Sequence, residues 1–469
     1  MNFEQLLFLA QNKTRIVSDS REVRPGDIFV ALPGTKVDGA SFIPEALAKG
    51  AKYVLSSSKE MLSQYPKQVV YHSDPRRALG ELAKRYYFPQ GRKIKLLGVT
   101  GTNGKTTTCF LLKHLLQSAG YKTGVLGTVE ISWPGYKQKA RQTTPDCLDL
   151  HATLAKMEAQ GVEVACLEVS SHALDQDRIA GLEFDVGIFT NLTQDHLDYH
   201  KDLPTYFQAK AKLFRQYTKR AVINGDCSYG REILQFFPGP KVSFGLNDDN
   251  DFRILKYLLN LKGMQVELLF RSSKKFFELK LLGKFNLYNA LAALGGASFL
   301  GLDLEVLKGL ETFMPPPGRM EKITNSKELH VIVDYAHTPD ALANVTQTLK
   351  ELTTGKLIVV FGCGGNRDRQ KRPLMAKAVA RYADVVVVTS DNPRFEEPMD
   401  IIGEIVTGFE PGFPYYVEPD RKQAIALGLS LVGREDILLI AGKGHEDYQE
   451  IKGKKIYFSD QDVVRELLG

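Results

Sequence analysis

Short apolar runs alternate along the chain with longer stretches in which apolar and polar positions mix, and this pattern predicts strands that alternate with helices. Near the N-terminus, residues 27–32 and 53–55 are predicted as short buried strands, with a helix at 43–49 between them. The Pro/Gly-containing segment 89–93 then breaks the pattern. We therefore expect a first mixed α/β domain over residues 1–90.

A regular strand–helix order follows in the middle of the chain. The pattern predicts strands at 94–100, 162–169 and 184–190 and a helix at 105–119. These strands are almost continuously apolar, as in a parallel sheet that is covered on both faces. The uncharged stretch 285–302 contains Asn286 and Asn289, so we expect an amphipathic helix and a turn there and no membrane span.

The stiff segment 315–318, Pro-Pro-Pro-Gly, predicts a joint between domains. Beyond it, strands are predicted at 330–335, 356–361, 384–389 and 436–441, with helical stretches between them. This order predicts a second, Rossmann-like doubly wound sheet. The expected fold class is thus α/β with three domains, over 1–90, 91–318 and 319–469, and a length of 469 residues suits about three domains.

Composition narrows the function classes. Apolar residues make up 43% of the chain and charged residues 25%, as is ordinary for a soluble protein, and no targeting segment is recognised. The five cysteines are scattered and form no CxxC pair, which argues against a zinc knot or a disulfide framework and favours a reduced, cytoplasmic compartment. The net charge of +6 is mild, and anionic small molecules account for it as well as nucleic acid would; we expect no nucleic-acid partner.

The clearest chemical motif is a phosphate-binding loop. The strand at 94–100 leads directly into Gly101-Thr102-Asn103-Gly104-Lys105-Thr106-Thr107 and then into a helix. Glycines let backbone N–H groups approach phosphates, Lys105 would neutralise phosphate charge, and the Thr106 hydroxyl would bind Mg²⁺. The loop departs from the strict Walker A pattern because Val99 stands where that pattern has glycine.

The class of nucleotide-binding protein is narrowed by two further observations. The string at 191–195 lacks the lysine of a guanine-reading NKxD motif, which argues against a GTPase. The strand 162–169 carries Glu168 near its end, and a carboxylate there can hold Mg²⁺.

Nine strings, in order, resemble the Mur ligase family of peptidoglycan synthesis. They are TGTNGKTTT (100–108), EVSSHALDQDR (168–178), TNLTQDHLDYH (190–200), GKFNLYNALAA (283–293), PGRME (317–321), DYAHTPD (334–340), GCGGNRDRQKRP (362–373), DNPR (391–394) and AGKGHEDYQ (441–449). The resemblance covers nearly the whole chain. It implies an N-terminal domain for a UDP-sugar, a central ATPase domain and a C-terminal domain for an incoming amino acid.

The resemblance also implies roles for individual residues. It assigns to the UDP-linked dipeptide Ser18, Ser20, Thr143, Thr144, Ser170, Gln176 and Arg178. It assigns to ATP, besides the loop, Asn286, Asn289, Arg319 and Asp334. It assigns to Mg²⁺ Thr106, Glu168, His196 and Lys210, with Lys210 carrying a carbamate. A carbamate is an anionic oxygen ligand, whereas an ammonium would repel the metal; Lys212 is a near neighbour that could be confused with Lys210.

The string DNPR bears on which amino acid is added. Asp391-Asn392-Pro393-Arg394 follows a predicted strand, and Arg367, Gly442 and Glu446 follow comparable ones. Within the family, DNPR is the pattern of members that add meso-2,6-diaminopimelate, while lysine-adding members depart from the arginine. Arg394 can hold the distal carboxylate with two hydrogen bonds, and Glu446 or Asp391 can accept from the ammonium.

The resemblance therefore implies an ATP-dependent amide ligase. In the first step, phosphate would be transferred to the D-glutamate γ-carboxylate of UDP-N-acetylmuramoyl-L-alanyl-D-glutamate with the help of Lys105, His196 and Lys210. In the second step, the amine of diaminopimelate would attack the acyl phosphate. We expect a monomer. Two alternatives stay open: a folylpolyglutamate synthase-like ligase, which would not need DNPR, and a nucleotide-dependent regulatory protein without turnover.

Overall fold

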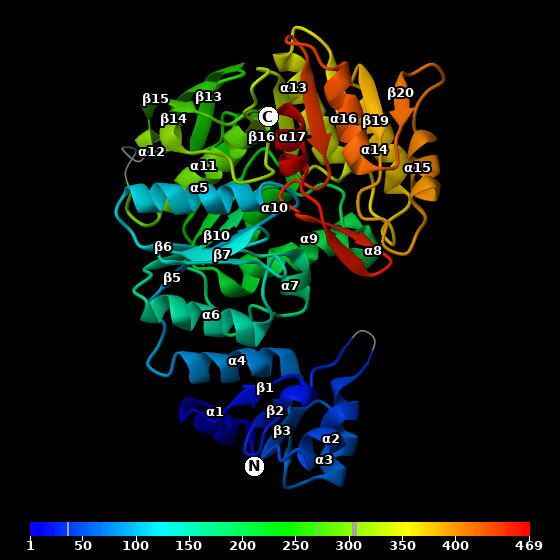
Figure 1. Ribbon diagram of the computed structural model, residues 1–469. Helices are drawn as coiled ribbons and strands as arrows, with labels where there is room; N and C mark the ends of the chain where they lie inside the picture. Colours follow the sequence, from blue (N-terminus) through cyan, green and yellow to red (C-terminus); the bar gives the residue numbers. More distant parts are fainter. Residues whose placement is uncertain (35–36, 271, 303–306) are drawn as a thin grey trace.

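The computed structural model describes residues 1–34, 37–270, 272–302 and 307–469. Three parallel or mostly parallel sheets follow one another along the chain (Figure 1). Every strand predicted from the apolar pattern is present, most of them one or two residues shorter at an end. The α/β fold class is thus confirmed, while the predicted boundaries at residues 90 and 318 stay a prediction.

The N-terminal unit is a parallel four-stranded sheet in the order β1-β2-β3-β4. Helix α4 lies between this sheet and α6 of the central unit (Figure 1). The elements are α1 (Phe3–Gln11), β1 (Ile16–Val17), β2 (Ile28–Val30), α2 (Ile43–Ala48), β3 (Tyr53–Ser56), α3 (Lys59–Gln64), β4 (Val69–Tyr71) and α4 (Pro75–Tyr87), with 3₁₀ turns at Ser20–Glu22 and Gly39–Phe42.

The central unit is built on an eleven-stranded sheet in the order β15-β14-β13-β12-β11-β10-β5-β9-β6-β7-β8. Strands β13 to β6 in that order are parallel, and antiparallel strands extend both edges. Neighbouring residues such as Leu96 and Leu97 enter separate cores on its two faces, which explains the continuous apolar runs.

The strands of the central unit are β5 (Lys95–Thr100), β6 (Thr123–Leu126), β7 (Glu130–Trp133), β8 (Tyr136–Lys139), β9 (Val164–Glu168), β10 (Val186–Phe189), β11 (Ala221–Asn224), β12 (Lys241–Gly245), β13 (Phe252–Asn260), β14 (Gly263–Phe270) and β15 (Ser273–Leu279). Its helices are α5 (Lys105–Ser118), α6 (Cys147–Ala159), α7 (Ser171–Asp175), α8 (Leu197–His200), α9 (Leu203–Lys212), a π-helical turn (Leu213–Tyr217), α10 (Ser228–Phe236), α11 (Lys284–Ser298) and α12 (Leu307–Thr312).

One prediction in this unit is wrong in kind. Helix α11 is not amphipathic: it is buried almost all round, including Asn286 and Asn289. It packs against α5 and against strands of the sheet, so it has no solvent-facing stripe to carry charge. The described residues include no helix that combines the length and apolarity needed to cross a bilayer.

The C-terminal unit has a six-stranded sheet in the order β16-β17-β21-β18-β19-β20, parallel except at β16. A separate hairpin, β22-β23, follows β21. The elements are β16 (Glu321–Ile323), β17 (His330–Asp334), α13 (Pro339–Leu352), β18 (Leu357–Phe361), α14 (Lys371–Ala380), β19 (Val385–Val388), α15 (Pro398–Val406), β20 (Tyr415–Val417), α16 (Arg421–Leu431), β21 (Ile437–Ala441), β22 (Tyr448–Ile451), β23 (Lys454–Tyr457) and α17 (Asp460–Leu468).

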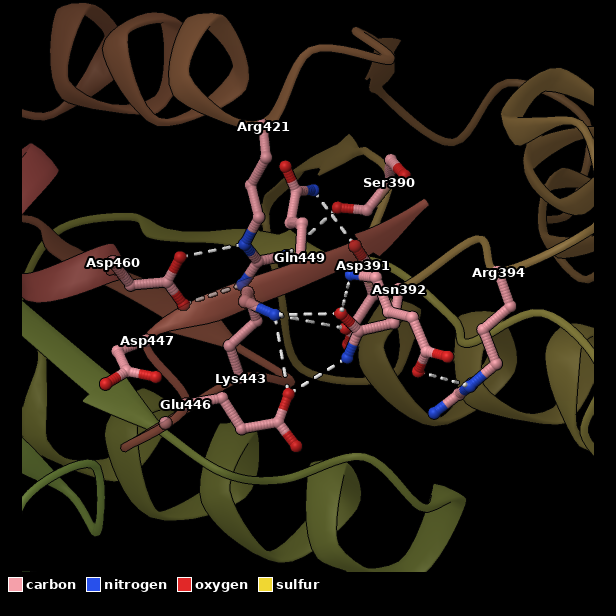
Figure 2. Close-up of polar contacts among 12 residues, drawn as sticks. Ser390, Asp391, Asn392, Arg394, Arg421, Lys443, Glu446, Asp447, Gln449 and Asp460 are labelled. Atoms are coloured by element: carbon pink, nitrogen blue, oxygen red, sulfur yellow. Dashed lines mark hydrogen bonds and ion pairs between the residues drawn. The ribbon is translucent and has the colours of Figure 1, made fainter. Parts of the chain in front are cut away.

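A buried ion pair fixes the carboxyl ends of two of these strands. Arg421 and Asp460 have fully buried side chains, with 2.7 Å between Nη2 and Oδ2 and 2.8 Å between Nε and Oδ1 (Figure 2). The same guanidinium donates to the carbonyl of Ala441 at 3.0 Å and to that of Ser390 at 3.5 Å. Arg421 therefore ties the end of β21 to the residues that follow β19.

We expect Arg421→Met to destabilise the C-terminal unit by about 3–5 kcal/mol, because it leaves the Asp460 carboxylate buried without its partner. Urea unfolding followed by circular dichroism measures this. The matched control is Lys422→Met, which removes the exposed 2.7 Å ion pair between Lys422 and Glu466 on the same two helices; its cost should stay below about 1 kcal/mol. Equal effects of the two substitutions would contradict the structural role given to Arg421.

Candidate active site

The loop between β5 and α5 has the geometry of a phosphate site. Gly104 precedes the helix with φ +86°, a left-handed conformation that favours glycine, and a Cβ there would lie 2.2 Å from the Asn289 side-chain oxygen. Lys105 folds back over the loop, and its Nζ donates to the carbonyls of Gly101 at 2.9 Å and Thr102 at 2.8 Å. The loop thus holds an ammonium beside a helix N-terminus, as a phosphate chain requires.

Two predicted metal ligands are in direct contact. Thr106 Oγ1 lies 3.0 Å from Glu168 Oε2, and the Glu168 side chain is fully buried at the end of β9. Thr128 also donates to this carboxylate, from its backbone N–H at 2.8 Å and its hydroxyl at 3.1 Å. A hydroxyl and a buried carboxylate are oxygen donors of the kind that Mg²⁺ prefers, so these residues fit the ion.

Lys210 reaches the same loop from α9. Its side chain is 1% exposed, and its Nζ donates to the Gly101 carbonyl at 2.8 Å, the same oxygen that Lys105 contacts. Burial, and next the Lys105 ammonium, lower the pKa of Lys210 well below its usual range. Lys212, two residues on, is only partly buried and contacts the carbonyl of Leu174 at 3.3 Å. The difference in burial therefore distinguishes Lys210 from Lys212, which the sequence alone did not.

His196 lies at the start of α8 in a left-handed conformation, φ +53°. Desolvation lowers the pKa of its imidazole despite the Asp195 carboxylate, whose Oδ2 is 3.4 Å from Nε2. A neutral ring nitrogen can bind a metal. Across the described ranges, neither His196 nor Lys210 bonds to Thr106 or Glu168, and no set of three or more His, Cys, Asp or Glu side chains forms a ready metal site.

A cavity of about 670 Å³ opens beside the phosphate loop, between the central and C-terminal units. The predicted nucleotide residues that line it are Asn103, Gly104, Thr107, Asn286, Asn289, Arg319 and Asp334. The two asparagines already have protein partners: Asn289 Nδ2 donates to Asn286 Oδ1 at 2.9 Å, and Asn286 Nδ2 to the Leu282 carbonyl at 2.7 Å. Their amides are therefore held in fixed orientations at the cavity wall.

Arg319 joins the C-terminal unit to the phosphate loop. Its Nη2 donates to Thr106 Oγ1 at 3.2 Å, and its guanidinium lies 4.7 Å from the centre of the Tyr335 ring. In the part of the chain that the structure describes, its buried Nε has no hydrogen-bond partner. Asp334 accepts from the backbone N–H groups of Met320 at 2.7 Å and Ala336 at 2.8 Å, so it shapes the turn that carries Arg319. A partly buried guanidinium whose buried Nε donor is unused suits an anionic ligand.

A second cavity, of about 440 Å³, extends from His196 into the C-terminal unit past Tyr335 and His337. The predicted amino-acid residues that line it are Arg367, Asp391, Asn392, Arg394, Gly442 and Glu446. Pro393 is buried and is not part of its lining. The structure therefore brings three segments to one wall: DNPR after β19, the segment 362–367 after β18 and the segment 442–446 after β21.

Arg394 is fixed in this wall. Its Nε donates to Glu450 Oε2 at 3.2 Å and its Nη1 to the Gly365 carbonyl at 2.8 Å. Among the residues described, none bonds to its Nη2. Asn392 Nδ2 donates to Glu446 Oε2 at 2.9 Å (Figure 2). A cation and a carboxylate thus line the same cavity.

The residues predicted to hold the UDP-linked dipeptide fall into two groups. Around the end of β9, Arg178 donates to Gln176 Oε1 at 2.8 Å and to the Thr144 carbonyl at 3.1 Å, and Thr144 contacts Ser170 at 3.3 Å. Thr143 lies 3.0 Å from Thr128, hydroxyl to hydroxyl, and so adjoins Glu168. Ser20 is in the N-terminal unit and donates to Glu45 Oε2 at 3.3 Å, while Ser18 is exposed there. No contact joins the two groups within the described ranges.

Comparison with known proteins decides the family. Family models match three parts of the chain: "Mur ligase family, catalytic domain" at residues 14–87, "Mur ligase middle domain" at 99–297 and "Mur ligase, glutamate ligase domain" at 318–444. A UDP-N-acetylmuramoyl-L-alanyl-D-glutamate--2,6-diaminopimelate ligase of Lawsonia intracellularis is 46% identical over 465 residues, which cover 97% of this chain and 96% of the relative.

The chain belongs to the Mur ligase family.

Solved structures agree with this. That of a UDP-N-acetylmuramoyl-L-alanyl-D-glutamate--2,6-diaminopimelate ligase is similar at a TM-score of 0.72 and 36% identity, covering 97% of this chain and 94% of the other. Mycobacterium tuberculosis folylpolyglutamate synthase, complexed with ADP and AMPPCP, reaches a TM-score of 0.63 at 21% identity, covering 78% of this chain and 92% of the other. The second likeness shows a shared fold alone.

The sequence prediction missed several residues that line this Mur ligase's two cavities or hold the residues that do. Asp340 lines the first, and its Oδ2 accepts from Asn103 at 3.0 Å and Thr193 at 3.2 Å. Glu450 fixes Arg394, and Lys443 is buried beside Asp391 and Glu446. Asp340 and Lys443 stand inside two of the family strings, DYAHTPD and AGKGHEDYQ, which was the available signal. Glu450 lies just beyond the second string.

Proposed function

We propose that this Mur ligase joins meso-2,6-diaminopimelate to UDP-N-acetylmuramoyl-L-alanyl-D-glutamate and converts ATP to ADP and phosphate. One observation carries the proposal: the second cavity runs from His196, near the phosphate loop, to a wall that holds Arg394 together with Glu446 and Asp391. Diaminopimelate has a carboxylate and an ammonium at its distal centre, and lysine has only the ammonium. A cavity with both a fixed guanidinium and carboxylates complements diaminopimelate better.

The first cavity would take ATP, with its phosphates on the loop 101–107 and its base toward Asn286 and Asn289. Lys105 would stabilise the phosphoryl group in transfer to the D-glutamate γ-carboxylate, and Arg319 would approach the same phosphates from the C-terminal unit. Mg²⁺, held by Thr106 and Glu168 with His196 and the modified Lys210, would offset the negative charge of the phosphates.

We propose that Lys210 carries a carbamate. The side-chain nitrogens of Lys105 and Lys210 contact the same carbonyl oxygen, so two ammonium groups there would repel each other. This repulsion, together with burial, favours the neutral amine form of Lys210. A neutral amine can add CO₂: the nitrogen lone pair forms the C–N bond, one C=O π bond of CO₂ opens to leave a negative charge on oxygen, and the nitrogen releases one proton to solvent. The product is an anion that would pair with Lys105 or a metal instead of repelling it.

The UDP-linked dipeptide would lie between the N-terminal and central units. Arg178, already ordered by Gln176 and Thr144, presents a guanidinium for a pyrophosphate or carboxylate. Thr143, Thr144 and Ser170 place their hydroxyls beside Glu168, so the peptide end would point toward the phosphate loop. Ser18 and Ser20 would contact the uridine end.

The order of events follows from the two cavities. The acyl phosphate would form at the phosphate loop, and the amine of diaminopimelate, entering from the second cavity past His196, would attack its carbonyl carbon. Phosphate would leave as the amide forms. Because the chemistry is mainly positioning, closure of the C-terminal unit over the loop, through contacts such as that of Arg319 with Thr106, should affect the rate. We propose a cytoplasmic monomer, since ATP and UDP-linked precursors are cytoplasmic and one chain lines both cavities.

We expect Arg319→Lys to lower kcat/KM for ATP about tenfold or more, because lysine cannot supply both the Thr106 contact and the unused Nε donor; a charge-assisted hydrogen bond is worth about 1.5–3 kcal/mol. Steady-state ADP release measures this. Arg465→Lys, at an exposed position of α17, is the control and should leave kcat/KM for ATP unchanged. An unchanged kcat/KM for ATP would exclude the role given to Arg319.

The test of the proposed function is ADP release with each acceptor in turn. Sustained release of ADP over many turnovers should require UDP-linked dipeptide, diaminopimelate and Mg-ATP together, and should not occur with a folate and glutamate. Release with the folate pair would favour the folylpolyglutamate synthase-like alternative, whose fold this chain shares. No ADP in any combination would favour the regulatory alternative.

A further inference from the structure

A buried lysine to which the proposed reaction gives no role lies behind the wall of the second cavity. The side chain of Lys443, in the turn after β21, is fully buried. Its Nζ lies 3.3 Å from Asn392 Oδ1, 3.4 Å from Glu446 Oε2 and 3.7 Å from Asp391 Oδ1 (Figure 2). One ammonium thus contacts three polar side chains that line the cavity.

Lys443 and the Glu450 backbone N–H together determine which way the Asn392 amide faces. Asn392 Oδ1 accepts from Lys443 and also from the Glu450 backbone N–H at 2.9 Å. Both neighbours are donors, so the amide must present its oxygen to them and its NH₂ to the opposite side. There Nδ2 donates to Glu446 Oε2 at 2.9 Å.

Glu446 is held by one oxygen only. Lys443 and Asn392 both contact Oε2, and over the described residues no hydrogen bond or ion pair reaches Oε1. Because Glu446 lines the cavity, Oε1 stands ready to accept from a ligand ammonium. Lys443 brings a single positive charge to two carboxylates, Asp391 and Glu446, so these three groups together keep one net negative charge that favours a cation.

We propose that Lys443 is a positioning residue for the amino-acid substrate: by holding Glu446 Oε2 and orienting Asn392, it directs Glu446 Oε1 at the substrate's ammonium. The inference rests on the proposed function and deepens it. Lys443 itself, buried behind these side chains, would not touch the substrate.

The test is steady-state and trapping kinetics on Lys443→Met, which keeps the length of the side chain and removes its charge. We expect KM for diaminopimelate to rise at least tenfold, with KM for ATP and for the UDP-linked dipeptide within twofold of the unsubstituted chain. Acyl phosphate formed without diaminopimelate, trapped with hydroxylamine as the hydroxamate, should accumulate at an unchanged rate. The control is Lys452→Met, an exposed lysine in the same unit, which should alter none of these values.

A role for Lys443 in stability alone would raise all three KM values together or slow hydroxamate formation, and either result would overturn the inference. If Lys443→Met does not fold, the same measurements are made on Lys443→Arg, which keeps the charge and a hydrogen-bond donor. In that variant too, only the KM for diaminopimelate should rise. Absence of hydroxamate and amide product from the unsubstituted chain would instead overturn the proposed function.

Discussion

Lys210→Ala is expected to reduce kcat for ADP release about 100- to 1000-fold, the range in which removal of one transition-state-stabilising group falls. The substitution removes the proposed carbamate and leaves a small buried space beside Gly101 and Lys105. Formate or acetate should occupy that space and restore part of the activity, because each supplies an anionic oxygen where the carbamate would stand.

Two controls make the Lys210 result specific. Lys212→Ala, on the same helix but only partly buried, should keep kcat within twofold. Removal of dissolved CO₂ and bicarbonate should lower the activity of the unsubstituted chain and leave that of Lys210→Ala unchanged. A Lys210→Ala variant with full activity, or one that carboxylates fail to rescue under any condition, would remove the case for a carbamate.

Arg394→Lys should raise KM for diaminopimelate by about 10- to 100-fold and leave KM for ATP unchanged. Lysine keeps the charge but loses the planar fork, and a charge-assisted hydrogen bond is worth about 1.5–3 kcal/mol, where about 1.4 kcal/mol is tenfold. It also cannot keep the contacts to Glu450 and Gly365 while addressing a carboxylate. The measurement is amide formation over a range of diaminopimelate concentrations.

The matched control is Arg381→Lys, an exposed residue at the end of α14 in the same unit, which should leave KM as it is. Discrimination provides a second readout. The unsubstituted chain should strongly prefer diaminopimelate over L-lysine, and Arg394→Lys should narrow that preference by the same factor as it raises KM. A preference that survives the substitution would place the recognition of the distal carboxylate elsewhere, with Arg367 as the next residue to test.

The strands that were predicted, such as β5 and β9, and the phosphate loop could be recognised in the sequence because their signals are local. An apolar run such as 94–100 marks a buried parallel strand, and the glycines after it mark the loop. Strands β13 to β15, which pair antiparallel with one another, are among those that were not predicted. In β13 the register shifts between Ile254 and Lys256, and this shift interrupts the alternation of buried and exposed positions. The two-residue period by which a strand is recognised in a sequence is therefore lost.

Other features depend on tertiary contacts that no local pattern carries. Nothing in the segment 209–212 shows which lysine is buried, because the oxygen that Lys210 contacts lies 109 positions away. The contact between Arg319 and Thr106 spans 213 positions and depends on how two units meet. Helix α11 lacks a charged face because it is covered on all sides, and Lys443 stands in a glycine-rich turn with no periodicity to mark it.

The most direct test of the proposed function is an amino-acid panel analysed by mass spectrometry, with UDP-linked dipeptide and Mg-ATP and with diaminopimelate, lysine, ornithine or glutamate as the amine. The product with meso-diaminopimelate should form at least 100-fold more efficiently than that with lysine, and it should carry one new amide and be matched by one ADP. A product formed equally well or better with lysine would contradict the role of Arg394 and with it the proposed substrate.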